Sequence, residues 1–353
     1  MSGTAFDLEH IFGLPQNDKA ARLLEGLLEL TEHHRARCHP YRQLLEALGW
    51  SGAEQLDGLP WLPVRLFKEH VLRSIPADQV FRRLTSSGTT GGGVSMIDLD
   101  AEAAQNQSKA LARTLQTVLG PSRLPMLIID SRAVTRGSSF SARGAGVLGM
   151  MSFGRQHVFA LDDQMQLDHD AIHRFLDRFG NEPFLIFGFT FMVWQYLSKV
   201  SAQATIDLSN GILIHSGGWK KLVDQAVSPS DFRSTLTATT GLHKITNYYG
   251  MVEQIGTVFL ESPDGDGSLT CPSFADVIIR DPLTFEPVPH GETGLIQTLS
   301  LLPTSYPGHS VLTEDLGRIV GVDDTERNGH RFVVLGRLPR AEARGCSDTF
   351  VAN

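Results

Sequence analysis

Apolar residues recur at helical spacing near the start of the chain. Between residues 17 and 48, Leu23, Leu24, Leu27, Leu28 and Leu30 fall on one broad face, which is the pattern of an amphipathic helix. A turn-rich stretch follows over residues 49–63. We therefore predict an N-terminal helical region over residues 1–58.

The middle of the chain alternates short apolar runs with helical patterns. The runs at residues 124–131, 183–189 and 211–218 are continuously apolar, as strands buried on both faces are. Helical patterns lie at about residues 101–119, 168–179 and 191–201. This rhythm predicts an α/β core over residues 59–267, with a mostly parallel sheet flanked by helices.

From residue 268 the pattern changes to short β-like pieces separated by turns, such as SFADVIIRD and HRFVVLGR. We predict a small β-rich subdomain over residues 268–336 and a short C-terminal tail over residues 337–353.

Composition narrows the class of protein. Of the 353 residues 41% are hydrophobic, and the net charge is −8, without the basic stripe that nucleic acids require. No apolar stretch reaches the roughly 18–20 residues of a membrane span, and the first residues do not resemble a signal peptide. The three cysteines, Cys38, Cys271 and Cys346, show no metal-site or disulfide spacing. We expect a cytoplasmic enzyme with no nucleic acid partner.

Residues 84–94 read LTSSGTTGGGV, which is rich in hydroxyl groups and glycine. Such a run cannot build a core, but its backbone N–H groups and hydroxyls can surround an anion. Taken alone, this pattern is also typical of a plain loop or linker.

Three downstream segments suit the rest of a nucleotide. TNYYGMVEQ (residues 246–254) offers aromatic rings and a carboxylate, which can stack on a purine and hold Mg²⁺. TEDLGRI (residues 313–319) places Asp315 before a glycine, where its carboxylate can accept hydrogen bonds from two ribose hydroxyls. LGRLPRAEARG (residues 335–345) places Arg337 after a glycine.

In this order the segments resemble the core motifs of adenylate-forming enzymes, which convert a carboxylate and ATP into an acyl-AMP and pyrophosphate. More narrowly, the chain resembles the acyl-protein synthetase (LuxE-type) branch. The likeness spans about residues 59–346 and rests on PVRLFKEH (63–70), SFSARGAG (139–146), IFGFTFMVW (186–194), HSGGWKK (215–221) and NYYGMVEQ (247–254). It implies the N-terminal domain of that superfamily, with its large mobile C-terminal domain largely absent.

The resemblance also implies roles for single residues, with ATP and Mg²⁺ as cofactors. Tyr249 would stack on adenine, with Asn247 near the exocyclic amine. Glu253 would ligate Mg²⁺, and Asp315 would bind the ribose hydroxyls with help from Arg337. The phosphates would lie in the loop of Thr85, Ser86, Ser87, Gly88, Thr89, Thr90 and Gly91, and the base would lie near Gly217, Gly218, Tyr248 and Gly250.

Two departures from the superfamily pattern matter. The residue before the glutamate is Val252, where many members carry a hydroxyl that touches the α-phosphate. Only sixteen residues (353 − 337) follow Arg337, and no lysine follows Lys244, so the lysine of the mobile domain has no counterpart. We expect Lys220, Lys221 or Mg²⁺ alone to offset charge at the α-phosphate. Lys68, in contrast, is interpreted as a surface lysine.

Cys346 lies seven residues from the end, near Arg340 and Arg344, which favour a thiolate. In the LuxE-type branch a C-terminal cysteine takes the acyl group, and Cys346 is expected to do so here. Cys38 and Cys271 are interpreted as structural. For the acyl tail the candidates are the apolar residues Phe187, Phe189, Phe191 and Trp194.

The leading hypothesis is ATP-dependent activation of a fatty or other apolar carboxylic acid. The acyl group would pass to Cys346 and on to a partner protein, such as a reductase, acyltransferase or carrier protein. One alternative ends on coenzyme A or a carrier-protein thiol. Another is a nucleotide-binding subunit that has lost adenylation.

Overall fold

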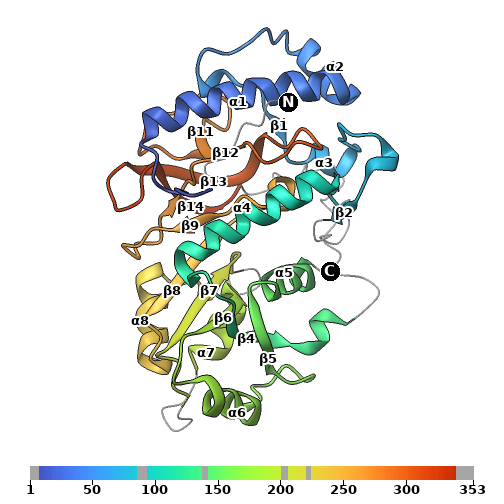
Figure 1. Cartoon of the computed structure of the whole chain (residues 1–353). Coiled ribbons are helices and arrows are strands. Elements are labelled where there is room, and N and C mark those ends of the chain that lie inside the picture. The colour runs from blue at the N-terminus through green and yellow to red at the C-terminus, as the bar shows by residue number, and fades with distance from the viewer. Residues whose placement is uncertain (1–7, 86–93, 137–141, 200–205, 220–223, 339–353) are drawn as a thin grey trace, which may run out of the picture.

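Most strands of the structure join into one mixed sheet (Figure 1). This computed structural model describes residues 8–85, 94–136, 142–199, 206–219 and 224–338. Across the described part of the chain the strand order is β11-β12-β13-β14-β10-β9-β8-β7-β6-β4-β5, and β1 pairs with β13. A separate pair, β2 and β3, flanks the Gly/Ser/Thr run.

The helices are α1 (Gln16–Arg37), α2 (His39–Ala47), α3 (Leu66–Glu69), α4 (Ala101–Leu119), α5 (Ala142–Met151), α6 (His169–Phe179), α7 (Thr190–Leu197) and α8 (Pro229–Thr240). The strands are β1 (Leu62–Pro63), β2 (Arg82–Thr85), β3 (Met96–Leu99), β4 (Leu124–Ser131), β5 (Gly154–Leu161), β6 (Phe184–Phe189), β7 (Gly211–Ser216), β8 (Lys244–Tyr249), β9 (Phe259–Glu261), β10 (Leu269–Thr270), β11 (Ala275–Arg280), β12 (Gly294–Ser300), β13 (Ser310–Val322) and β14 (His330–Arg337).

The strands β5, β4, β6, β7 and β8 form a parallel half that is covered by helices on both faces. Successive residues of a strand point to opposite faces, so Leu127 packs with α6, α7 and α8, whereas Ile128 packs with α4 and α5. This arrangement is why the predicted strands read as continuous apolar runs. The parallel α/β prediction is confirmed here.

The strands β9 to β14 form an antiparallel half. Leu23, Leu27 and Leu30 of α1 pack on it, and α4 runs between the two halves in Figure 1. The predicted boundary at residue 268 falls between β9 and β10, within the one sheet. The division into subdomains stays a prediction.

The N-terminal helical stretch is divided into α1 and α2. Cys38 between them has an extended backbone, and Pro40 lies in the first turn of α2. A proline lacks the N–H that would continue the first helix, so the break follows from the sequence.

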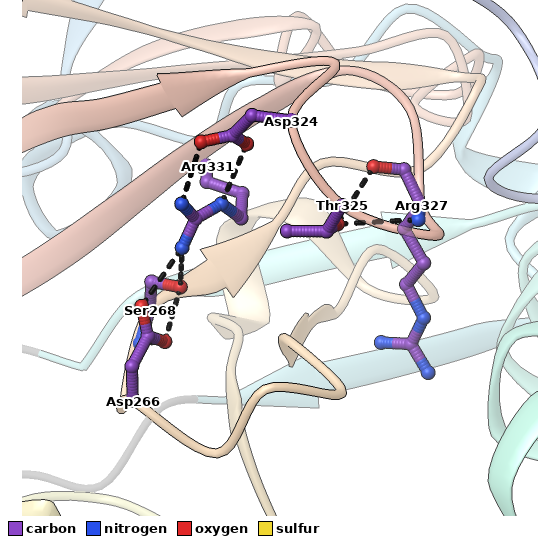
Figure 2. A network of polar contacts seen from close by, with 6 residues as sticks. All are labelled: Asp266, Ser268, Asp324, Thr325, Arg327 and Arg331. Atoms are coloured by element: carbon purple, nitrogen blue, oxygen red, sulfur yellow. Dashed lines mark hydrogen bonds and ion pairs between the residues drawn. The ribbon is translucent and has the colours of Figure 1, made fainter.

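Polar contacts hold α1 against β11 and hold the start of β14 in place. Asp276 on β11 accepts a 2.6 Å hydrogen bond from the Gln16 side chain and lies 3.5 Å from the Lys19 ammonium. Burial alone would raise the pKa of Asp276, but the charges of Lys19 and His330 hold it well below its usual range. At the start of β14, Arg331 binds both oxygens of Asp324 and contacts Asp266 and Ser268 (Figure 2).

Candidate active site

The predicted nucleotide residues gather where the parallel half meets the antiparallel half. The carboxyl ends of β7 and β8 lie side by side, with His215 paired to Asn247 and Ser216 to Tyr248. Ligands of α/β proteins bind at this edge of a parallel sheet. Gly217 follows directly, with a φ of +81° that favours glycine, and its backbone is exposed.

Tyr249, Asp315 and Arg337 form a connected group. The Tyr249 hydroxyl donates a 2.7 Å hydrogen bond to one carboxylate oxygen of Asp315, and the other oxygen lies 3.3 Å from Arg337 Nε. Burial and the charge of Asp315 raise the pKa of Tyr249 well above its ordinary value, which keeps the phenol a donor. The Tyr249 ring packs against Phe259 and Phe332.

Asn247 lies two residues earlier, on the same face of β8 as Tyr249. Its backbone N–H donates to Glu261 at 2.7 Å, and Arg233 pairs with Glu261 at the same distance. The Asn247 side-chain oxygen is buried and has no hydrogen-bond partner among the described residues. An unpaired buried acceptor suits an amine donor of a ligand.

Glu253 lies in a 3-10 turn over Val252–Gln254 and is 5% exposed. Gln254 fixes the turn by donating to the carbonyls of Thr298 and Gly308, at 3.0 and 2.9 Å. Burial raises the pKa of Glu253, and a hydrogen bond from the Ser95 side chain lowers it in part. Val252, which replaces the usual hydroxyl, packs against the core around Tyr41 and Phe67.

No cation of the described residues lies within ion-pair distance of Glu253. A buried carboxylate without a cationic partner is costly, and its oxygens are the donors that Mg²⁺ prefers. The residue therefore fits the predicted metal role.

The predicted acyl residues divide into two kinds. Phe187 is completely buried in the core. Phe189 is half-buried between two glycines: a Cβ at Gly146 would lie 2.8 Å from its ring, and a Cβ at Gly217 would lie 3.4 Å from it. Phe191 stacks on Phe189, and Trp194 contacts Trp219 edge-on.

Several predicted site residues lie outside the described part of the chain, namely Ser86, Ser87, Gly88, Thr89, Thr90, Gly91, Lys220, Lys221 and Cys346. Thr85 ends β2 and is exposed, Tyr248 is partly buried, and Gly218 and Gly250 are exposed. Cys38 and Cys271 are buried and unpaired, and burial raises the pKa of both thiols, as suits structural cysteines. Ser95 and Gln254 were not predicted as site residues. Ser95 directly follows the run over residues 84–94, and Gln254 ends the TNYYGMVEQ segment, so their positions next to motif residues were the only signal.

The family model of the acyl-protein synthetase LuxE matches residues 11–353. The chain belongs to the LuxE acyl-protein synthetase family. The expected family and the expected class of enzyme, a ligase, are thereby confirmed.

Two curated relatives of this LuxE-family chain are named long-chain-fatty-acid–luciferin-component ligase. The Vibrio harveyi protein is 24% identical over 94% of this chain and 87% of its own. The Aliivibrio fischeri protein is 24% identical over 83% of this chain and 78% of its own.

Solved structures of adenylate-forming ligases share the fold. A crystal structure of 2-hydroxyisobutyryl-CoA ligase with 2-HIB-AMP has a TM-score of 0.69 at 15% identity, covering 96% of this chain and 72% of the other. ATP-bound MatB from Rhodopseudomonas palustris has a TM-score of 0.50 at 18% identity, covering 75% and 49%. Within its described residues the LuxE-family chain has no helix of the length and hydropathy that a membrane span needs.

Proposed function

We propose that this LuxE-family enzyme activates a carboxylic acid with ATP and then moves the acyl group to Cys346. In the first step a carboxylate oxygen bonds to the α-phosphorus, the bond to the bridging oxygen breaks, and pyrophosphate leaves with the electron pair. In the second step the Cys346 thiolate attacks the acyl carbon and AMP leaves. The thioester then passes to a partner protein.

The observation that carries this proposal is the grouping of Asn247, Tyr249, Glu253 and Asp315 at one sheet edge. Asp315 accepts hydrogen bonds from the ribose hydroxyls and is held by Tyr249 and Arg337. The free Asn247 oxygen accepts from the adenine amine, while Tyr249 lies beside the base and Gly217 lets the backbone approach it.

Glu253 holds Mg²⁺ in this proposal. When bound, Mg²⁺ supplies positive charge to the phosphates of the nucleotide. The loop that begins at Thr85 binds the outer phosphates through its hydroxyls and N–H groups.

The acid is an apolar one, such as a fatty acid. Phe189, Phe191 and Trp194 are partly buried next to the β7 turn, and the curated relatives are named for long-chain fatty acids. Their aromatic surfaces favour an alkyl or aryl tail.

Transfer to coenzyme A is the second candidate, because a 2-hydroxyisobutyryl-CoA ligase of this fold has been crystallised with CoA. In that case Cys346 takes no part.

One experiment tests the sequence of steps. The protein is incubated with Mg²⁺-ATP and a panel of acids, and its intact mass and ATP–pyrophosphate exchange are measured. We expect exchange with one acid class and an acyl adduct that Cys346→Ser abolishes while exchange continues. The matched control Cys38→Ala keeps the adduct. Exchange without an adduct, with acyl-CoA formed on adding CoA, would establish the second candidate; no exchange with any acid would contradict both.

A further inference from the structure

The short helix α3 is anchored beside the strand that carries Asp315. Strand β1 pairs in parallel with β13, and the Val64 N–H continues that pairing with a 2.9 Å bond to the Leu312 carbonyl. Arg65 then lies 3.7 Å from Glu314. Helix α3 therefore begins beside Glu314, the residue directly before Asp315.

Helix α3 packs, through Phe67, against Tyr306, which lies near the turn of Glu253. Phe67 is completely buried and meets the Tyr306 ring edge-on, with centroids 6.2 Å apart. Tyr306 in turn contacts Gly308, where a Cβ would lie only 2.5 Å from the Glu253 carbonyl oxygen. The helix also packs on β3, which begins one residue after Ser95.

Lys68 follows the buried Phe67 and stays half-exposed. The sequence predicted a surface lysine here, and among the described residues Lys68 makes no ion pair within 4 Å. Its charge, like that of Arg337, reaches Glu253 and opposes the effect of burial on the carboxyl pKa.

The position of Lys68 relates it to the Gly/Ser/Thr run as well. That run leaves β2 at Thr85 and enters β3 at Met96, the strand on which α3 rests. The helix that carries Lys68 therefore packs on the strand that pairs with the exit of this run at Thr85, and the Lys68 charge also acts on the buried carboxyl of Glu253. Cations converge in this way where an anion is to be bound.

We propose that Lys68 binds the phosphate chain of the nucleotide opposite Glu253, and that it supplies the charge that adenylation needs. This inference rests on the proposed function and names a further catalytic residue for it. As the carboxylate oxygen bonds to the α-phosphorus, negative charge grows on the phosphate oxygens and on the departing pyrophosphate. The Lys68 ammonium offsets that charge without giving up a proton.

The first test compares single alanine variants of Lys68, Lys220 and Lys221 with Lys109→Ala, an exposed lysine on α4 that loses the same charge. We expect Lys68→Ala to lower the rate of ATP–pyrophosphate exchange by about 10²–10³-fold, and Lys68→Arg to restore part of it. The melting temperature should stay that of the wild type, because the side chain is half-exposed and unpaired.

A second measurement does not depend on the reaction. Calorimetric titration should show that Lys68→Ala weakens binding of Mg²⁺-ATP and of pyrophosphate at least tenfold, but leaves AMP affinity within threefold. A merely structural lysine would weaken all three alike.

The outcomes separate the two proposals. If the wild type exchanges pyrophosphate and Lys68→Ala does so within threefold, or if only a Lys220 or Lys221 variant loses exchange, the inference on Lys68 is wrong. If the wild type exchanges with no acid, the proposed function fails, and the pyrophosphate titration still decides whether Lys68 binds phosphate.

Discussion

The hydroxyl of Tyr249 on β8 donates a 2.7 Å hydrogen bond to the carboxylate of Asp315 on β13. This contact joins the parallel half of the sheet to the antiparallel half at the proposed ribose site. It orients Asp315 before any nucleotide binds, and such preorganisation lowers the cost of ligand binding.

Removing this hydroxyl should therefore weaken ATP binding while the aromatic ring stays in place. A hydrogen bond to a charged group contributes about 1.5–3 kcal/mol, and Asp315 keeps partial access to water, so we expect Tyr249→Phe to raise the dissociation constant for ATP about tenfold. Asp315→Ala should raise it further. Tyr196→Phe on α7 is the matched control, and equal affinities for Tyr249→Phe and this control would contradict the ribose role.

Glu253→Gln should separate stability from activity. Above the raised pKa of Glu253 the wild type carries a buried charge that Gln lacks, so the variant should be more stable to unfolding there and lose exchange about 10²–10³-fold. Mg²⁺ should raise the melting temperature of the wild type alone. Denaturation with and without Mg²⁺ tests this, and a variant that Mg²⁺ still stabilises would remove Glu253 from the metal site.

The difference in stability between Glu253→Gln and the wild type should depend on pH with a definite sign. The pKa of Glu253 is raised in the folded protein, so the folded state prefers the protonated carboxyl. The stability advantage of Glu253→Gln should shrink as the pH falls through that raised pKa, because protonation removes the buried charge from the wild type. Mg²⁺ affinity of the wild type should fall over the same pH range.

Local patterns predicted the elements that bury a continuous face. The bounds expected for α4 and β4 agree with the structure, because the helical period of α4 and the unbroken apolar run of β4 each extend over the whole element. Strand β5 was missed: it lies at the sheet edge, and its first residues, GRQH, are mostly polar. For the break between α1 and α2 the signal in the sequence was Pro40, which lies inside the helical pattern over residues 17–48.

The site was predictable residue by residue but not as a geometry. Tyr249 and Asp315 are 66 positions apart. No local sequence pattern predicts that the Tyr249 hydroxyl bonds to the Asp315 carboxylate. Lys68 shows the same limit, because its relation to Glu253 depends on how β1 pairs with β13. Such contacts follow from strand register over long separations, which tertiary packing decides.

Two arginines of β14 should differ in what they support. Arg331 is largely buried and binds Asp324 in bidentate fashion together with Asp266, whereas Arg337 is 62% exposed and contacts Asp315 alone. Arg331→Ala should lower the unfolding free energy by about 1–3 kcal/mol with ATP affinity unchanged. Arg337→Ala should cost less than about 1 kcal/mol and weaken ATP binding several-fold. Urea unfolding and nucleotide titration of both variants check this, and the reverse pattern would contradict the site assignment.

Acid should weaken the protein through a pair of buried histidines. His34 and His309 stack with ring centroids 5.0 Å apart. His34 donates from Nε2 to the Pro303 carbonyl and accepts from the Ser74 hydroxyl at Nδ1, so it is held neutral. Burial lowers the pKa of His309 to about 3 and that of His34 well below its ordinary value.

The unfolded chain therefore binds protons below about pH 6.5 that the folded protein does not. Stability is complete above that pH and falls as the pH drops toward 3, by about 1.4 kcal/mol per pH unit for each such histidine. His309→Asn should reduce this slope between pH 6 and 4 by one histidine's share, whereas the exposed His169→Asn should leave it unchanged. Urea unfolding at a series of pH values measures the slope. An unaltered slope in His309→Asn would show that this ring is protonated in the folded protein.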